Sequence, residues 1–146
     1  MAAAERAIGR ALPEAYRAFL LRHDSGFIAA DLVFSENKKE LTAERWNANY
    51  LRGCDDLVQE YEDAVILERD VNPDVMDWPY IPFCHTAGQE TLVFGPPGPE
   101  GLHPVLDAFH EVGATEWRIL ANSFSEFLAL YVDAYGYPEV IASPER

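Results

Sequence analysis

The sequence is poor in cysteine, in basic residues and in long apolar runs, and each shortage excludes a class of protein. Two cysteines, Cys54 and Cys84, match no disulfide framework and no zinc-binding spacing. Eleven Lys and Arg against 25 Asp and Glu give a formal charge of −14, which argues against binding nucleic acid or an anionic membrane through clustered cations. Apolar runs such as 64–67 are far shorter than the roughly 20 residues that span a bilayer. Glu5 and Arg6 interrupt the apolar run that a signal peptide needs, so we expect a soluble, cytoplasmic protein with reduced thiols.

The composition suits one folded domain. The chain has 146 residues, and single domains most often contain about 100–150. Hydrophobic residues make up 49% of the chain and aromatic residues 12%, which is enough to fill a core and argues against intrinsic disorder. Because we find no internal repeat, long linker or low-complexity tail, we expect a single domain over residues 1–146.

Four segments have the apolar spacing of amphipathic helices. The first covers about residues 3–11. The second begins at Pro13, because proline is favoured at the first helical position, and Gly26 is placed to end it. The third begins near Asp56, and the last begins at Ser123.

The second and fourth of these helices supply a candidate core. Ser123 and Glu126 form a capping-box pattern, in which a serine oxygen and a glutamate accept hydrogen bonds from free backbone N–H groups at a helix start. The inner stripes of the two helices predict five buried side chains: Phe19, Leu20, Phe124, Phe127 and Leu128.

Short apolar or alternating runs between turn residues predict the strands. They cover residues 27–34, 80–84, 91–94, 104–109 and 117–120. The Gly- and Pro-rich segment 95–101 is predicted to be a hairpin loop. The expected fold class is α+β: N-terminal helices, an antiparallel or mixed meandering sheet of about five to six strands with an inserted helix, and a capped C-terminal helix.

With these elements placed, several motifs stand in a familiar order along the chain, over about residues 5–132. They are Ile8-Gly9, LPEAYRAFLLRHDSG (12–26), WPYIPF (78–83), Ala87-Gly88 leading into ETLVF (90–94), and LANSFSEFLALY (120–131). In this order the chain resembles the SUKH superfamily, which includes a yeast cell-wall-synthesis regulator of the Smi/Knr type and many bacterial immunity proteins. The resemblance implies a SUKH-like domain and a non-enzymatic immunity protein that neutralises a cognate toxin, often a nuclease, by direct association.

Negative charge is concentrated in one segment. Residues 53–77 hold nine acidic residues and one basic residue, Arg69. This run is either a solvated helix face or a negative surface that attracts and docks a basic protein. Trp and Tyr often anchor interfaces, and two of them stand beside the acidic run. The candidate partner-binding residues are therefore Trp46, Tyr50, Asp55, Asp56, Glu60, Glu62, Asp63, Glu68 and Asp70.

Helical spacing divides these acids between faces. Residues 60 and 63 share one face of the helix, and residue 62 points elsewhere. Three further aromatic residues, Trp78, Tyr80 and Trp117, fit either a core or an interface.

Neither a metal site nor a catalytic site is expected. Residues 70–74 place oxygen ligands at the spacing of a calcium loop, but Pro73 stiffens the segment and the obligate glycine is missing. Cys84 and His85 are adjacent on a predicted strand, so their side chains point to opposite faces. The pattern favours a buried structural thiol beside a surface histidine, and no cofactor motif is present.

Three interpretations therefore follow. The first is a non-enzymatic module that binds a basic protein, such as a nuclease toxin, through its acidic surface. The second is an intracellular scaffold or regulator of the same fold whose partner is not a toxin. The third is a small hydrolase that uses Cys84 or a histidine.

Overall fold

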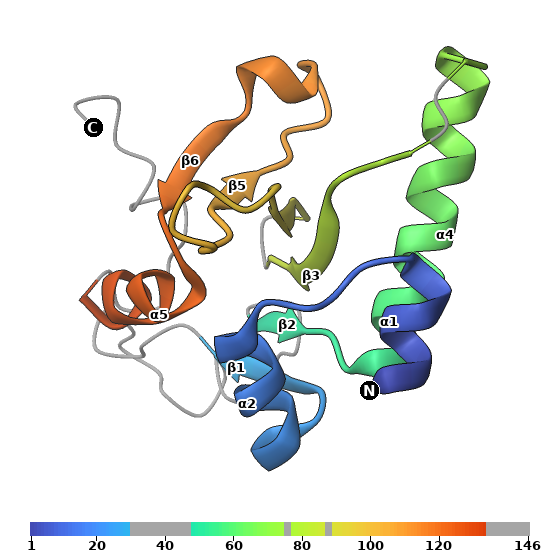
Figure 1. Ribbon diagram of the computed structural model, residues 1–146. Coiled ribbons are helices and arrows are strands. Elements are labelled where there is room, and N and C mark those ends of the chain that lie inside the picture. Colours follow the sequence, from blue (N-terminus) through green and yellow to red (C-terminus); the bar gives the residue numbers. More distant parts are fainter. Residues whose placement is uncertain (30–47, 75–76, 87–88, 134–146) are drawn as a thin grey trace.

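A computed structural model describes residues 1–29, 48–74, 77–86 and 89–133, and its elements form helices around one sheet (Figure 1). The helices of this part of the chain are α1 (Ala2–Ile8), α2 (Glu14–His23), α4 (Cys54–Val71) and α5 (Phe124–Asp133), with a short 3₁₀ helix, η3 (Ala114–Glu116). The strands are β1 (Gly26–Ala29), β2 (Ala48–Leu51), β3 (Ile81–His85), β4 (Thr91–Phe94), β5 (Val105–Asp107) and β6 (Arg118–Ala121). The α+β fold class is confirmed.

The six strands form an antiparallel meander in which each strand pairs with the next along the chain, in the order β1-β2-β3-β4-β5-β6. The hairpin predicted over residues 95–101 joins β4 to β5, where the N–H of Gly95 donates to the carbonyl of Pro104 at 2.9 Å. Helix α4 is inserted between β2 and β3. The strand predicted over 27–34 is β1, and residues 30–34 lie outside the described part of the chain.

Strand β2 was not predicted, because Asn49 interrupts the apolar pattern. Its side chain is 2% exposed, and the Asn49 Nδ2 donates a hydrogen bond to the Tyr131 hydroxyl on α5 at 2.6 Å. A buried amide is tolerated when it is hydrogen-bonded, so this bond accounts for a polar residue inside the sheet.

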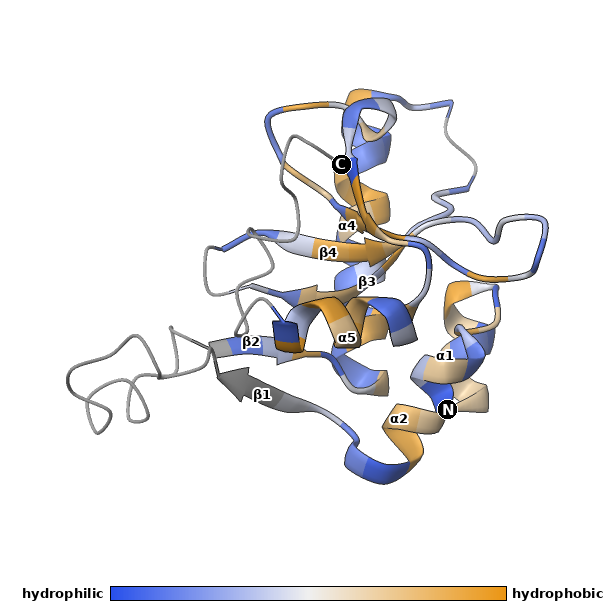
Figure 2. Ribbon diagram, turned by 90° about the vertical axis from the view of Figure 1, so that its left-hand side faces the viewer, coloured by the Kyte–Doolittle hydropathy of each residue, from blue (hydrophilic) through white to orange (hydrophobic). Residues whose placement is uncertain are grey.

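The core is dominated by aromatic rings from α2, α5 and the central strands. Tyr16 is fully buried, and its ring lies edge-on to Phe83, Phe94 and Phe124 at centroid distances of 5.5, 5.2 and 5.0 Å. The Tyr16 hydroxyl donates to the carbonyl of Arg52, which ties α2 to the segment between β2 and α4. Figure 2 shows apolar residues gathered along α5 and the central strands that it faces.

The burial predictions are largely confirmed. Leu20, Phe124 and Phe127 are buried, whereas Phe19 and Leu128 are half-buried and pack at the edge of the same cluster. Their partial exposure was not predicted, because helical spacing shows which residues lie on the buried face of a helix but not which of them lie at the edge of that face.

Local signals at the helix ends are correct in part. The Ser123 Oγ accepts a hydrogen bond from the N–H of Glu126 at 3.1 Å, and the Glu126 carboxylate accepts one from the N–H of Asn122 at 3.0 Å, which confirms a capping box at α5. Helix α2 ends before Gly26: Asp24 caps it with a φ of 51°, and Gly26 begins β1. Helix α1 ends earlier than predicted, at Gly9, whose φ of 73° suits glycine.

No helix in the described part of the chain has the length and apolar character that a membrane span requires.

Candidate protein-binding surface

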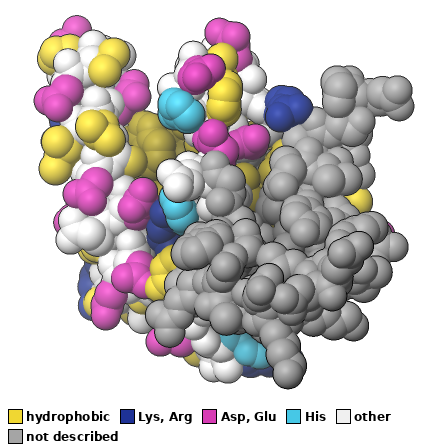
Figure 3. Space-filling view, turned by 180° about the vertical axis from the view of Figure 1, so that it is seen from behind, with side chains coloured by type: hydrophobic (Ala, Val, Ile, Leu, Met, Phe, Trp, Pro, Cys, Tyr) yellow, Lys and Arg dark blue, Asp and Glu magenta, His cyan; other side chains and the backbone are white. Residues whose placement is uncertain are grey.

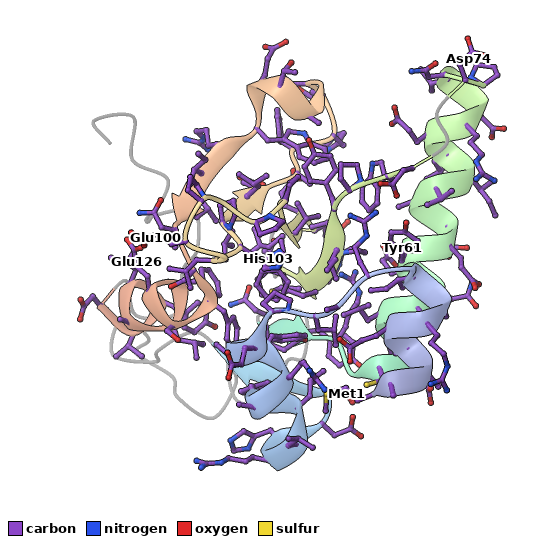
Figure 4. The ribbon with its side chains drawn as sticks, viewed as in Figure 1. Met1, Tyr61, Asp74, Glu100, His103 and Glu126 are labelled. Atoms are coloured by element: carbon purple, nitrogen blue, oxygen red, sulfur yellow. The ribbon has the colours of Figure 1, made fainter. Side chains whose placement is uncertain are left out.

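Helix α4 carries most of the predicted site residues and stands at one side of the sheet (Figure 1). Its first half is anchored: Leu57 is fully buried, and Tyr61 is 9% exposed and points toward the sheet (Figure 4). Its second half extends past the core, and Asp74 lies beyond the end of the helix (Figure 4). The helix therefore presents its C-terminal half to solvent.

Two of the predicted acids are bound within the protein. Asp56 accepts a hydrogen bond from the Tyr50 hydroxyl, and burial together with this carboxylate raises the pKa of Tyr50. The Glu60 Oε1 lies 3.5 Å from the Nη2 of Arg52, whose side chain is 7% exposed. The Arg52 Nη1 is buried and has no hydrogen-bond partner in the described part of the chain. Among the described residues, Glu60 is the acid that forms an ion pair with Arg52, and its carboxylate compensates the charge of this guanidinium. Asp56 and Glu60 therefore stabilise the fold around the start of α4.

Other predicted acids are available to a partner. Asp63 accepts one hydrogen bond, from the amide of Gln59 at 3.1 Å, and is exposed. Four more acids on α4 form no hydrogen bond or ion pair with any described residue: Asp55, Glu62, Glu68 and Asp70. Trp46 lies outside the described residues.

A groove of about 650 Å³ separates α4 from the connection between β5 and β6, and we call it the α4 groove. Its first wall is formed on α4 by Glu60, Asp63, Ala64, Leu67, Glu68 and Val71. Its floor includes Trp78, Tyr80, Pro82 and Val93. Its second wall includes His110, Val112 and Trp117. Figure 3 shows this face, with acidic and apolar side chains interspersed along α4 and apolar side chains in the hollow beside it.

The floor of the groove lies on the side of the sheet opposite the aromatic core. Successive side chains of a strand point to opposite faces, so Phe83 and Phe94 enter the core while Pro82 and Val93, which are register partners, face the groove. On the facing helix α4, residues 60 and 63 line the groove and residue 62 does not, which agrees with the helical spacing.

A row of aromatic rings runs from Tyr61 on α4, beside the groove, to Trp117, the residue before β6. Tyr61 lies 6.0 Å from Trp78, Trp78 lies 5.5 Å from Tyr80, and Tyr80 lies 4.9 Å from Trp117, measured between ring centroids. Trp78, Tyr80 and Trp117 are half-buried. Sequence reasoning left their role open, because residues 78–80 and 117 are brought together only by the fold.

Cys84 is unsuited to nucleophilic chemistry. Both cysteines are free, but Cys84 is fully buried, and this burial raises the pKa of its thiol to about 12. Its neighbour His85 is exposed, so the predicted arrangement of a buried thiol beside a surface histidine is confirmed. A nucleophilic cysteine needs a thiolate near neutral pH, which the surroundings of Cys84 oppose.

Alkylation distinguishes the two cysteines. At pH 8 we expect iodoacetamide to modify the half-buried Cys54 in the native protein and to leave Cys84 unmodified, because the raised pKa keeps this thiol protonated below about pH 12. In urea both residues should react. Mass spectrometry of the peptides checks the result, and rapid native modification of Cys84 would contradict it.

No group of three or more His, Cys, Asp or Glu side chains that could hold a metal ion occurs among the described residues.

Comparison with known proteins identifies the family. The chain matches the model of the SMI1/KNR4 family (SUKH-1) over residues 1–130. No curated protein and no solved structure matches it. The family match covers the N-terminal helices, the whole sheet and most of α5, and it confirms the resemblance to the SUKH superfamily. The protein therefore belongs to the SMI1/KNR4 family (SUKH-1).

Proposed function

We propose that this protein is a non-enzymatic binding module, an immunity protein that neutralises a basic toxin by direct association through α4. The observation that carries the proposal is the composition of the exposed part of this helix. Three apolar side chains there, Ile66, Leu67 and Val71, are 59%, 67% and 85% exposed, beside acids without a described cationic partner. Apolar side chains that stay in water do not stabilise a solvated helix face, whereas their burial against a partner stabilises a complex, so their presence here favours a docking surface.

The chemistry of the surface favours a basic protein as partner. A formal charge of −14 repels nucleic acid and attracts cationic proteins over long range. Nucleases carry Lys and Arg on the face that binds nucleic acid, because that face must neutralise phosphates. An acidic helix docked on this face would block access to the substrate. The SUKH-1 family assignment supports the same role.

Co-expression tests the proposal. Large secreted proteins encoded beside this chain are searched for C-terminal domains that arrest growth when expressed inside a bacterium. We expect co-expression of this protein to restore growth and the two purified proteins to form a stable complex in gel filtration. Failure of both rescue and complex formation would overturn the proposal. A stable complex with a partner that does not arrest growth would replace the toxin with a regulatory target.

A further inference from the structure

The apolar side chains on the inner side of α4 lack a covering partner in the described structure. Leu67 and Val71 are 67% and 85% exposed, although both line the α4 groove. They are one helical turn apart, so they form a short apolar ridge along one wall. An aliphatic side chain of a bound partner would remove this ridge from water.

The aromatic row beneath this ridge suits a cation. Trp78, Tyr80 and Trp117 line the groove, and their rings meet edge to face with interplanar angles of 68° and 65°. Adjacent rings in this arrangement present ring faces in different directions. The face of Trp or Tyr attracts a guanidinium or ammonium group within about 6 Å of the ring centroid.

The charges around the groove favour the same kind of ligand. Its described lining contains four acids and neither Lys nor Arg. Asp77 is paired with Arg10, and Glu60 with Arg52, so these two are partly compensated. Asp63 and Glu68 on α4 have no cationic partner among the described residues. A cation above the aromatic row would therefore also lie beside uncompensated carboxylates.

From this combination we propose that the α4 groove binds a segment of the partner in which basic and aliphatic side chains alternate or adjoin. An Arg or Lys side chain lies across Trp78, Tyr80 and Trp117 between the acidic residues of α4, and an aliphatic side chain packs on Leu67 and Val71. The inference names the partner chemistry of the proposed binding function and rests on it. Charge complementarity selects a basic segment, and the exposed apolar ridge selects a protein segment over a small free cation.

A short peptide tests the groove without the natural partner. The probe is acetyl-Leu-Arg-Leu-Arg-amide, and its control is the same peptide with citrulline in place of arginine, which keeps the shape and removes the charge. We expect the arginine peptide at millimolar concentration to shift the indole N–H resonances of Trp78 and Trp117, and the citrulline peptide to shift them much less. Absence of these shifts, or equal shifts with both peptides, would overturn the proposal.

Matched variants separate groove binding from general attraction to an acidic protein. Leu67→Ser and Glu68→Gln change groove residues, whereas Leu21→Ser and Glu100→Gln change exposed residues of the same types on other parts of the surface, outside the groove. We expect the first pair to weaken peptide binding by about fivefold or more, the size of change that a contact in an interface centre produces, and the second pair to bind as the wild type does. Equal losses in both pairs would show binding by net charge alone and contradict the proposal.

The natural partner separates this inference from the proposed function. If the protein neutralises a toxin but Leu67→Ser and Glu68→Gln bind that toxin as the wild type does, the groove proposal fails while the function stands. If the arginine peptide binds the groove but no neighbouring toxin is neutralised, the function fails while the groove stands.

Discussion

Phe127→Ala is expected to lower the free energy of unfolding by about 3–5 kcal/mol, because truncation of a buried aromatic side chain removes apolar contacts and leaves a cavity. Phe127 is 1% exposed, and its ring lies 5.9 Å from Phe83 and 5.7 Å from Tyr131 between centroids. Urea unfolding followed by circular dichroism measures the loss. A loss of this size is a large part of the total stability of a typical domain.

Two further variants make this result interpretable. Val132→Ala on the same helix removes apolar atoms from a side chain that is 72% exposed, so its effect should stay within about 0.5 kcal/mol. Phe127→Leu retains much of the buried apolar area and should lose less stability than Phe127→Ala, which keeps the comparison possible if the alanine variant does not fold. Equal effects of Phe127→Ala and Val132→Ala would contradict the packing of α5 against the sheet.

The order of the elements was predictable because its determinants are local. The capping box at Ser123, the apolar stripe through Leu20 and the apolar run in residues 91–94 each depend on neighbours in sequence. Strand β2 was missed because Asn49 depends on Tyr131, which lies 82 positions away in sequence. A hydrogen bond over this separation leaves no local pattern.

The candidate site was predictable only as a segment. The acidic run and the shared face of residues 60 and 63 follow from composition and helical period. The ion pair of Glu60 with the buried Arg52 does not follow from these patterns, because it depends on how α4 packs against the segment that precedes it. The α4 groove could not be predicted from the sequence either, since its lining brings residues 78–80 together with Trp117. Segments this far apart in sequence become neighbours only when the sheet forms.

The ion pair of Glu60 with Arg52 determines which acidic residues of α4 can be replaced by lysine to test the proposed docking of a basic toxin. Replacement of Glu60 by lysine would place a second cation 3.5 Å or so from a guanidinium that is 7% exposed, and an uncompensated buried charge destabilises a fold strongly. Glu62, Glu68 and Asp70 form no ion pair with described residues; Glu68 and Asp70 lie in the last turn of α4, and the exposed Glu62 lies at its middle. Cations near a helix C-terminus interact favourably with the helix dipole, and a substitution at an exposed unpaired residue has little effect on stability, so the three lysine substitutions should leave the melting temperature nearly unchanged.

The triple variant Glu62→Lys, Glu68→Lys, Asp70→Lys is expected to slow association with the toxin about 10- to 100-fold at low ionic strength, because charge on the docking face governs long-range attraction. The dissociation rate should change less than the association rate. At 1 M salt the Debye length falls to about 3 Å, so the association rates of variant and wild type should converge. Stopped-flow or surface plasmon resonance measurements over a salt series provide both rates.

The matched control is Glu100→Lys, Glu116→Lys, Asp133→Lys, which changes the formal charge of −14 by the same amount on exposed residues outside α4. If net charge alone drives association, both triple variants should slow it equally. If α4 is the docking face, the α4 variant should slow association more, because screened attraction acts mainly within a Debye length of about 10 Å at 0.1 M salt. Equal association rates for the α4 variant and the wild type at low salt would assign the acidic residues of α4 to a solvated surface. Docking would then have to involve another face of the protein.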